Sequence, residues 1–170
     1  MPRDADLAKG VVAGLAAGLV ASLAMDLFQR VAHRLQSSEE ASDDDPATVK
    51  AANAVARQFT GRPVPRFAKP AAGEAVHDAT GTGLGALYGA LAELAPVATS
   101  GTGAGYAVAT WAAFDGGAVP MLGWGPKPAE TPPSSHAYGL ASHLVYGVTL
   151  ELARKPIRAR LRAEANAAKL

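Results

Sequence analysis

The stretch GVVAGLAAGLVASLAMDLF, residues 10–28, sets the structural class of this 170-residue chain. It contains no ionisable residue before Asp26. A transmembrane helix needs about 20 mainly apolar residues, and this stretch has no polar stripe at helical spacing that water could cover. We therefore predict a first membrane helix over residues 10–28, and we expect it to be kept rather than removed as a secretory signal peptide.

Three further stretches have the same character. Residues 79–98, 102–122 and 134–153 are apolar or small except for a few ionisable groups. Together with the first stretch they predict an all-α fold, a four-helix transmembrane bundle that forms one integral membrane domain over residues 1–170. The alternative is a soluble helical protein rich in Ala and Gly, but four apolar helices in so short a chain leave little to bury them.

One large hydrophilic segment, residues 29–78, separates the first two predicted spans. Within it the pattern predicts a short amphipathic helix over residues 46–60, with Asp45 as its N-cap and Gly61 at its end. Such a helix can lie on a membrane surface or cover the bundle.

The basic residues predict an orientation. The tail 154–170 carries a dense group of Lys and Arg next to the fourth predicted span. Because cytoplasmic loops of membrane proteins are enriched in Lys and Arg close to the helix ends, we expect both termini in the cytoplasm and residues 35–76 on the opposite side.

Composition excludes several classes of chemistry. The chain has no Cys, so it has no disulfide framework, thiolate metal site or cysteine nucleophile. Its 16 Lys and Arg against 15 Asp and Glu give no basic excess, so we expect no nucleic-acid partner. The glycine runs at 81–85 and 101–105 lack the strand and the Lys-Ser/Thr of phosphate loops, and no GxSxG motif is present. We therefore predict no enzymatic activity and no cofactor.

Small residues recur every four positions in the predicted spans. In lipid such residues let helix backbones approach closely, which is a main source of helix association there. The predicted helix-packing residues are Gly14, Gly18, Gly81, Gly85, Gly89, Gly139 and Gly147.

Ionisable residues share the helix faces of these glycines, which predicts that they face other helices rather than lipid. The candidate intramembrane polar network consists of Asp26, Glu93, Asp115, His143 and Glu151. Two interpretations remain open. These groups fix the register of neighbouring helices, or they line a path for protons or ions, which is the default hypothesis for ionisable groups inside a membrane.

Metal binding is a weaker hypothesis. His77, Asp78 and His136 fall at the same predicted depth, but their spacing matches no metal-binding motif. We therefore predict no metal site and keep these three residues as weak candidates.

Four blocks of sequence resemble the YagU-like family of bacterial inner-membrane proteins, whose molecular function is not established. The blocks are KGVVAGLAAGLVASLAMDLF at 9–28, HDATGTGLGALYGALAE at 77–93, FDGGAVPMLGWGPKPAETPP at 114–133 and HAYGLASHLVYGVTLELARK at 136–155. The resemblance implies a multi-pass protein of the bacterial inner membrane and supplies no catalytic residues.

The functional hypothesis that follows is a non-enzymatic membrane protein. Besides the lipid bilayer, its expected partners are other membrane proteins or further copies of itself, as in an accessory or structural subunit of a larger complex. The alternative hypothesis is a proton, ion or metal conduit that uses the intramembrane Asp, His and Glu residues.

Overall fold

The computed structural model describes residues 2–35 and 44–167, and within these ranges the chain is all-helical, without a β-strand. The predicted all-α class is therefore confirmed. The α-helices are α1 (Pro2–Leu35), α2 (Ala47–Thr60), α3 (Lys69–Leu94), α4 (Ala104–Ala113), α5 (Val119–Met121) and α6 (Pro133–Ala167). Shorter elements are the 3₁₀ turns η1 (Arg66–Ala68), η2 (Pro96–Thr99) and η4 (Pro128–Glu130), and the π-helical turn η3 (Phe114–Ala118).

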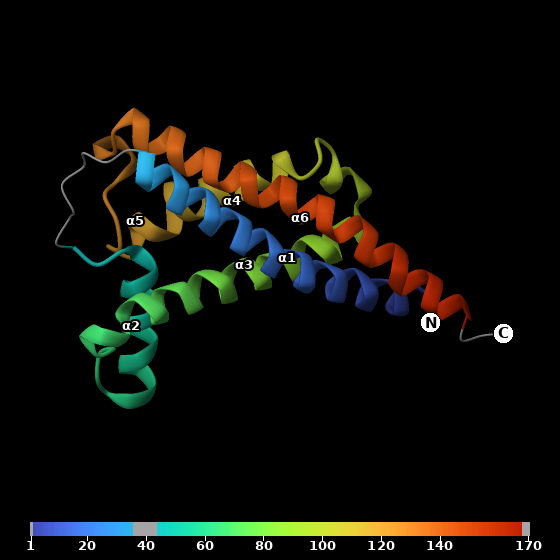
Figure 1. Ribbon diagram of the computed structural model, residues 1–170, viewed down its shortest axis with the longest axis horizontal. Helices are drawn as coiled ribbons and strands as arrows, with labels where there is room; N and C mark the ends of the chain where they lie inside the picture. Colours follow the sequence, from blue (N-terminus) through green and yellow to red (C-terminus); the bar gives the residue numbers. More distant parts are fainter. Residues whose placement is uncertain (1, 36–43, 168–170) are drawn as a thin grey trace.

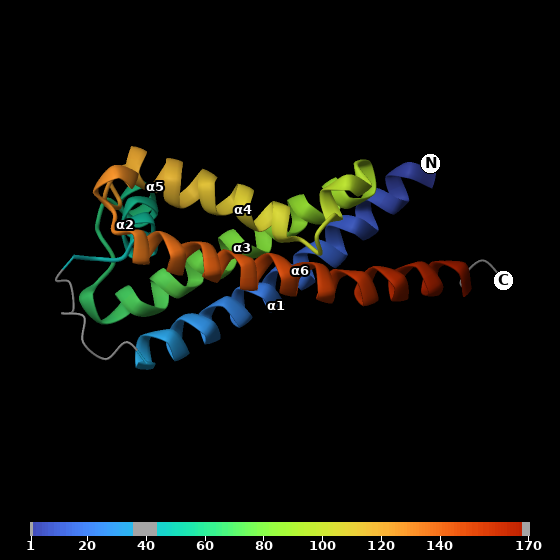
Figure 2. The same cartoon turned by 90° about the horizontal axis from the view of Figure 1, so that it is seen from above.

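The long helices run lengthwise beside one another and alternate in direction. In Figures 1 and 2, α1 leads away from the end where both termini lie, α3 returns to that end, α4 leads away again and α6 returns. Helix α1 packs against α3 and α6, and α4 packs against α6. Helix α2 packs on α3 at the end of the bundle far from the termini, where it crosses the direction of the long helices.

Glycines let α1 and α3 approach until their backbones touch. A Cβ atom on Gly14 would lie 2.9 Å from the carbonyl carbon of Gly85, and one on Gly18 would lie 2.9 Å from the Cα of Gly85. A Cβ on Gly89 would meet the backbone of Gly10. Only residues without a side chain permit this approach, so the four-residue spacing becomes a contact between two helices.

A second close contact joins α6 to the start of α4. A Cβ on Gly147 would lie 2.6 Å from the carbonyl oxygen of Gly103 and 2.7 Å from the Cβ of Ala107. Gly103 has a φ of 83°, in the left-handed region that favours glycine, and it directly precedes α4. The sharp turn into α4 and its contact with α6 therefore both require small residues.

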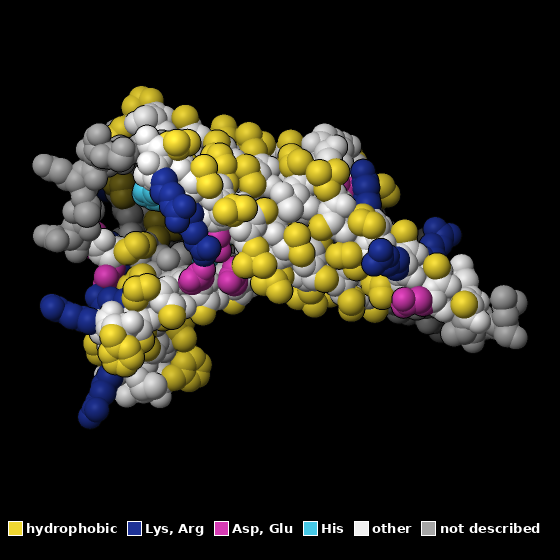
Figure 3. All heavy atoms as spheres, in the orientation of Figure 1, with side chains coloured by type: hydrophobic (Ala, Val, Ile, Leu, Met, Phe, Trp, Pro, Cys, Tyr) yellow, Lys and Arg dark blue, Asp and Glu magenta, His cyan; other side chains and the backbone are white. Residues whose placement is uncertain are grey.

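The core contains mainly small side chains, while many large apolar ones face outward. Ala17, Ala21, Tyr88 and Leu150 are fully buried. On the outer face of α1 the exposed residues are Val12, Leu15, Leu19, Val20, Leu23, Leu27, Val31 and Leu35. Figure 3 shows such apolar side chains over the length of the bundle, with the charged ones mostly toward its two ends.

One described helix, α1, is long and apolar enough to cross a membrane by length and composition, over Asp6–Leu35. Core helices of soluble proteins and N-terminal signal sequences share this property. The other predicted spans differ from α1 in the structure. Helix α3 ends at Leu94 before Pro96, and the third predicted span is divided among α4, η3 and α5.

The predicted start of the short helix over residues 46–60 needs correction. Helix α2 begins at Ala47 with Pro46 at its N-cap position, and no side chain caps it. Asp45 instead pairs with Lys69, because the start of α3 lies beside the start of α2. The end of α2 is as predicted: Gly61 adopts a φ of 71° and its N–H donates to the carbonyl of Arg57.

Candidate functional site

A cavity of about 540 Å³ lies at the end of the bundle far from the termini. Its wall combines residues from α1, α3, α4, η3, α5 and α6. The start of α2 and the connector between α5 and α6 (residues 122–132) complete it. Three histidines, His77, His136 and His143, line it together with Asp115. This volume lies in the range of small-molecule sites, about 300–1,000 Å³.

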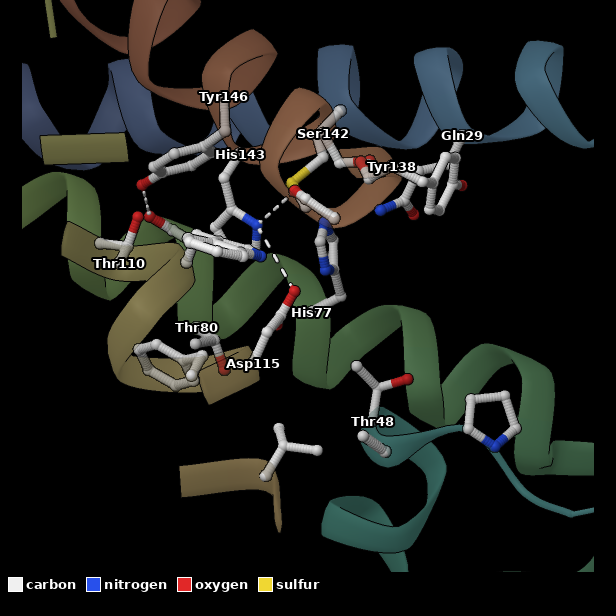
Figure 4. Close-up of a pocket in the computed structure, with 18 of the residues that line it drawn as sticks. Gln29, Thr48, His77, Thr80, Thr110, Asp115, Tyr138, Ser142, His143 and Tyr146 are labelled. Carbon is white, nitrogen blue, oxygen red and sulfur yellow. Dashed lines mark hydrogen bonds and ion pairs between the residues drawn. The ribbon is translucent and has the colours of Figure 1, made fainter. Parts of the chain in front are cut away.

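Asp115 and His143 face one another across this cavity (Figure 4). Asp115 Oδ2 lies 4.0 Å from His143 Nδ1, which is too long for a hydrogen bond but close enough for an ion pair when the ring is protonated. The Nδ1–H of His143 donates to the carbonyl of Gly139 at 2.9 Å. In the neutral ring Nε2 is therefore the acceptor nitrogen.

Asp115 sits in the π-helical turn η3, directly after α4. A π-turn inserts an extra residue into the helix, rotates the following side chains, and is frequent at functional sites. Gly139 on α6 leaves room for the carboxylate, since a Cβ there would lie 2.7 Å from Asp115 Oδ2. The backbone of η3 and a glycine on α6 thus position this acid together.

A second histidine–aspartate pair lies on the other side of the cavity. His77 Nε2 on α3 is 3.2 Å from Asp26 Oδ1 on α1, and both side chains are mostly buried. His77 lines the main cavity and also a neighbouring one of about 290 Å³, which Asp26 and His33 line as well. Each pair of packed helices therefore contributes one imidazole and one carboxylate to the same end of the molecule.

The inner end of the cavity is closed by polar groups that bond within the chain. The hydroxyl of Tyr146 donates to the carbonyl of Gly81 at 2.6 Å, linking α6 to α3. Ser142 Oγ donates to the carbonyl of Tyr138, and Thr110 Oγ1 to that of Ala107. Beyond this layer lie the close glycine contacts of α1 with α3.

Helix α2 and the connector before α6 meet over the open side. Lys50 Nζ donates to the carbonyl of Trp124 at 3.3 Å and to Asp44 Oδ2 at 2.6 Å. This hydrogen bond from Lys50 holds the pKa of Asp44 below its ordinary value. In the first turn of α6, the Nε2–H of His136 donates to the carbonyl of Pro128 in the connector at 2.9 Å, and its ring lies edge-on to Trp111.

The other members of the predicted polar network lie apart from this cavity. Arg158 on α6 donates to both carboxylate oxygens of Glu93 at 2.6 and 3.0 Å, and to Asp6 at 3.0 Å. The hydrogen bond to Glu93 raises the pKa of the Arg158 guanidinium above its ordinary value. These contacts tie α1, α3 and α6 together at the end that carries the termini.

Glu151 is fully buried beside Arg154, which donates to its carboxylate at 2.7 and 3.0 Å. Lys155 Nζ lies 3.5 Å from the same carboxylate. The five predicted residues therefore form four separate pairs rather than one network: Asp26 with His77, Asp115 with His143, Glu93 with Arg158, and Glu151 with Arg154.

The seven predicted packing glycines all contact residues of this chain, and Gly139 does so with a side chain of the cavity. Five of them, Gly14, Gly18, Gly81, Gly85 and Gly89, lie in the contact of α1 with α3. A Cβ on Gly81 would meet Ser22 Oγ, and Gly147 faces α4.

The weak metal candidates do not come together as ligands. Among the described residues, no group of three His, Cys, Asp or Glu side chains is close enough to hold a metal ion. His77 faces Asp26, and His136 is hydrogen-bonded to the connector. The side-chain oxygen Oδ1 of Asp78 is buried and has no hydrogen-bond partner within the described part of the chain.

Two contributors to the site were not identified from the sequence. Trp111 lies one turn before Asp115 in the chain and lines the cavity beside Gly139. Tyr146 is almost fully buried and closes the cavity. The sequence feature that could have identified them is the rarity of aromatic residues, which make up only 6% of the chain. In a chain rich in Ala and Gly, each large ring fills a space that the small side chains leave between helices.

Comparison with known proteins adds a family but no activity. No curated protein and no solved structure matches the chain. A family model described as "Protein of unknown function (DUF1440)" matches residues 53–152, which is more than half of the 170 residues. The match includes His77, Asp115, His136 and His143 and begins after Asp26. The chain therefore belongs to the DUF1440 family, whose function is not established.

Proposed function

We propose that this chain is a multi-pass protein of the bacterial inner membrane, with spans at 10–28, 79–98, 102–122 and 134–153. The alternating directions of α1, α3, α4 and α6 support this, since four crossings bring both termini to one side. The outward-facing Leu and Val side chains of α1 support it further, because a contiguous apolar surface of this length is costly in water.

Within that frame, we propose that the cavity binds and releases protons or a small cation, as the entrance of a conduit. The observation that carries this proposal is that two histidine–aspartate pairs, from two different pairs of helices, meet at one cavity. Asp115, His143 and His77 line it, and Asp26 reaches His77 from the neighbouring cavity. Histidine is the side chain whose charge ordinarily changes near neutral pH. Ionisable groups at membrane depth are costly and mark ion or proton pathways.

A continuous path across the membrane requires a second conformation of the helix bundle. Between the cavity and the end with the termini lie the glycine contact of α1 with α3 and the ion pairs of Arg158. These contacts must separate for a bound proton or ion to leave on the far side, as in alternating-access transporters.

Proton flux into liposomes tests the conduit. With a pH-sensitive dye trapped inside, we expect Asp115→Asn and His143→Gln each to slow acidification by at least about tenfold, the effect of about 1.4 kcal/mol on a rate. Glu130→Gln is the matched control, since this acid pairs with Lys127 in the exposed connector. Wild-type protein without flux, or variants as active as wild type, would refute the conduit.

Thermal unfolding and flux of alanine variants at the same two positions separate transport from a purely structural role. If the pair only stabilises the bundle, His143→Ala lowers stability and the double change with Asp115→Ala recovers part of the loss. In the conduit, the single variants lose flux while their unfolding temperature stays close to that of the wild type.

A second candidate is the accessory subunit of a larger membrane complex. It is favoured by Gly83 and Gly105, whose added Cβ atoms would meet nothing within 4 Å. Exposed glycines on α3 and α4 leave room for the backbone of a further helix. Purification in mild detergent tests it: stoichiometric membrane proteins that remain bound support the subunit, and a homogeneous single species contradicts it.

A further inference from the structure

Helix α2 and the segment after it expose large apolar side chains outside the predicted spans. Phe59 is 84% exposed, Phe67 in η1 is 89% exposed, and Val55 is 55% exposed. One turn apart, Val55 and Phe59 share a face of α2. Val49 and Ala52, in the first half of α2, are buried. Val55 and Phe59 continue this apolar stripe into the second half, where it is exposed, so only the first half of the stripe packs inside the molecule.

Cationic side chains accompany this apolar surface. Residues 46–73 contain five basic residues and no acidic one: Lys50, Arg57, Arg62, Arg66 and Lys69. Lys50 and Lys69 pair with Asp44 and Asp45. The three arginines are exposed, and no ion pair joins them to another residue in the described ranges.

The position of α2 matches the surface of a bilayer. It crosses the direction of the long helices at one end of the bundle, so it lies along the membrane plane if those helices span the membrane (Figures 1 and 2). Apolar and basic side chains gather at this corner of the molecule in Figure 3. The N–H of Val64 donates to Asn53 Oδ1 at 2.9 Å, which holds the following segment against α2.

We propose that α2 and residues 61–68 form an interfacial anchor that binds the surface of an anionic lipid bilayer, with Val55, Phe59 and Phe67 inserted at the headgroup boundary and Arg62 and Arg66 at the lipid phosphates. This inference rests on the proposed membrane location and holds for either orientation. Arg57 lies about 200° around the helix from Phe59, on the water side.

Lipid fits this surface better than a protein does. A stable protein interface buries about 800 Å² on each partner, and the anchor offers only three large apolar side chains. Aromatic and aliphatic residues combined with arginines are the composition of helices that bind anionic membrane surfaces.

Because the chain lacks cysteine, one introduced cysteine carries a spin label without background. The label is placed at Val55 on the anchor, at Ala54 on a different exposed face of α2, or at Leu19 on the outer face of α1. The full chain is reconstituted in vesicles of zwitterionic lipid with about one third anionic lipid. Frequent collisions of the spin label with oxygen show that the label lies in lipid, and frequent collisions with a water-soluble nickel complex show that it lies in water.

We expect oxygen to dominate at Leu19 and Val55, with Val55 at the shallower depth, and nickel to dominate at Ala54. If Leu19 lies in lipid while Val55 is as exposed to nickel as Ala54, the anchor is refuted and the membrane location stands. If all three labels lie in water, both proposals fail. Dipolar coupling between labels at Val55 would assign this surface to a second copy of the chain and overturn the proposal.

The charge preference has its own measurement. A fluorophore attached to the Val55→Cys variant is quenched by nitroxide on the headgroup of either an anionic or a zwitterionic lipid. We expect stronger quenching by the anionic lipid, and we expect Arg62→Gln and Arg66→Gln each to reduce this preference by up to about fivefold. Arg160→Gln on the exposed face of α6 is the control. An equal response to both lipids in the labelled chain with its arginines intact would contradict the anionic specificity.

Discussion

At the scale of single residues, the absence of a side chain is the most consequential feature of this protein. Gly14, Gly18 and Gly85 bring α1 and α3 into backbone contact, whereas Gly83 on the same α3 faces open space. As single residues in the sequence, the two kinds of glycine are indistinguishable. The four-residue spacing distinguishes them, because residues four apart share a helix face and Gly83 falls off that face.

Gly85→Ala tests this difference. Its Cβ would lie 2.6 Å from the Cα of Gly18, a backbone atom that cannot move away by rotation. We expect a loss of about 1–3 kcal/mol in the free energy of unfolding, measured by thermal unfolding in mild detergent. Gly83→Ala is the matched control and should be neutral or stabilising by up to about 1 kcal/mol, because alanine is the better helix former. Equal effects at both positions would argue against close packing.

At the scale of elements, the two ends of the bundle have different roles. At the end with the termini, Arg158 of α6 pairs with Asp6 of α1 and Glu93 of α3 and so joins three helices. At the other end, carboxylates face imidazoles and a cavity. Arginine keeps its charge at all physiological pH values, so its ion pairs are permanent, whereas histidine can lose its charge. The end with the histidines is therefore the one suited to a change in protonation or conformation.

Arg158→Gln tests the tie between the helices. It removes the forked hydrogen bonds to Glu93 and the contact with Asp6. Hydrogen bonds to charged groups contribute about 1.5–3 kcal/mol each, so we expect the first turns of α1 to exchange amide hydrogens markedly faster, by one to two powers of ten. Arg160→Gln on the same helix is exposed and should leave exchange unchanged. Unaltered exchange in both variants would show that the glycine contacts alone hold this end.

At the scale of the whole molecule, the order of directions constrains how the chain can sit in a membrane. Helices α1, α3, α4 and α6 alternate, and both termini lie at one end with α2 at the other. By length and composition only α1 meets the criterion for a membrane-spanning helix among the described residues. The proposed transmembrane bundle therefore requires α3, α4 and α6 to cross the membrane packed against α1. Their few charged side chains then face neighbouring helices rather than lipid.

Reporter fusions check this topology. We expect a reporter at the C-terminus to be cytoplasmic and one inserted beside Asp44 to be on the opposite side, because an odd number of spans separates them. Reporters in the same compartment would rule out four spans. Opposite but exchanged compartments would reverse the orientation and leave the number of spans intact.

The sequence alone determined what depends on neighbours along the chain. Helical class follows from apolar runs of about 20 residues. The packing faces follow from small residues at four-residue spacing, since a helix turns by a fixed angle per residue. The end of α2 followed from Gly61, whose positive φ is a local requirement. Asp115 and His143 both belong to the polar network that the sequence predicts, and they lie 4.0 Å apart.

Tertiary structure decided which distant residues meet. Asp26 pairs with His77 rather than with another predicted network residue, and Glu93 binds Arg158 from the tail. These partners depend on the rotation and offset of whole helices, which are set by backbone contacts at glycines and by the extra residue in the π-turn at Asp115. No local pattern encodes such offsets, because they result from all contacts between the helices at once. The cavity between the two histidine–aspartate pairs is a product of that packing.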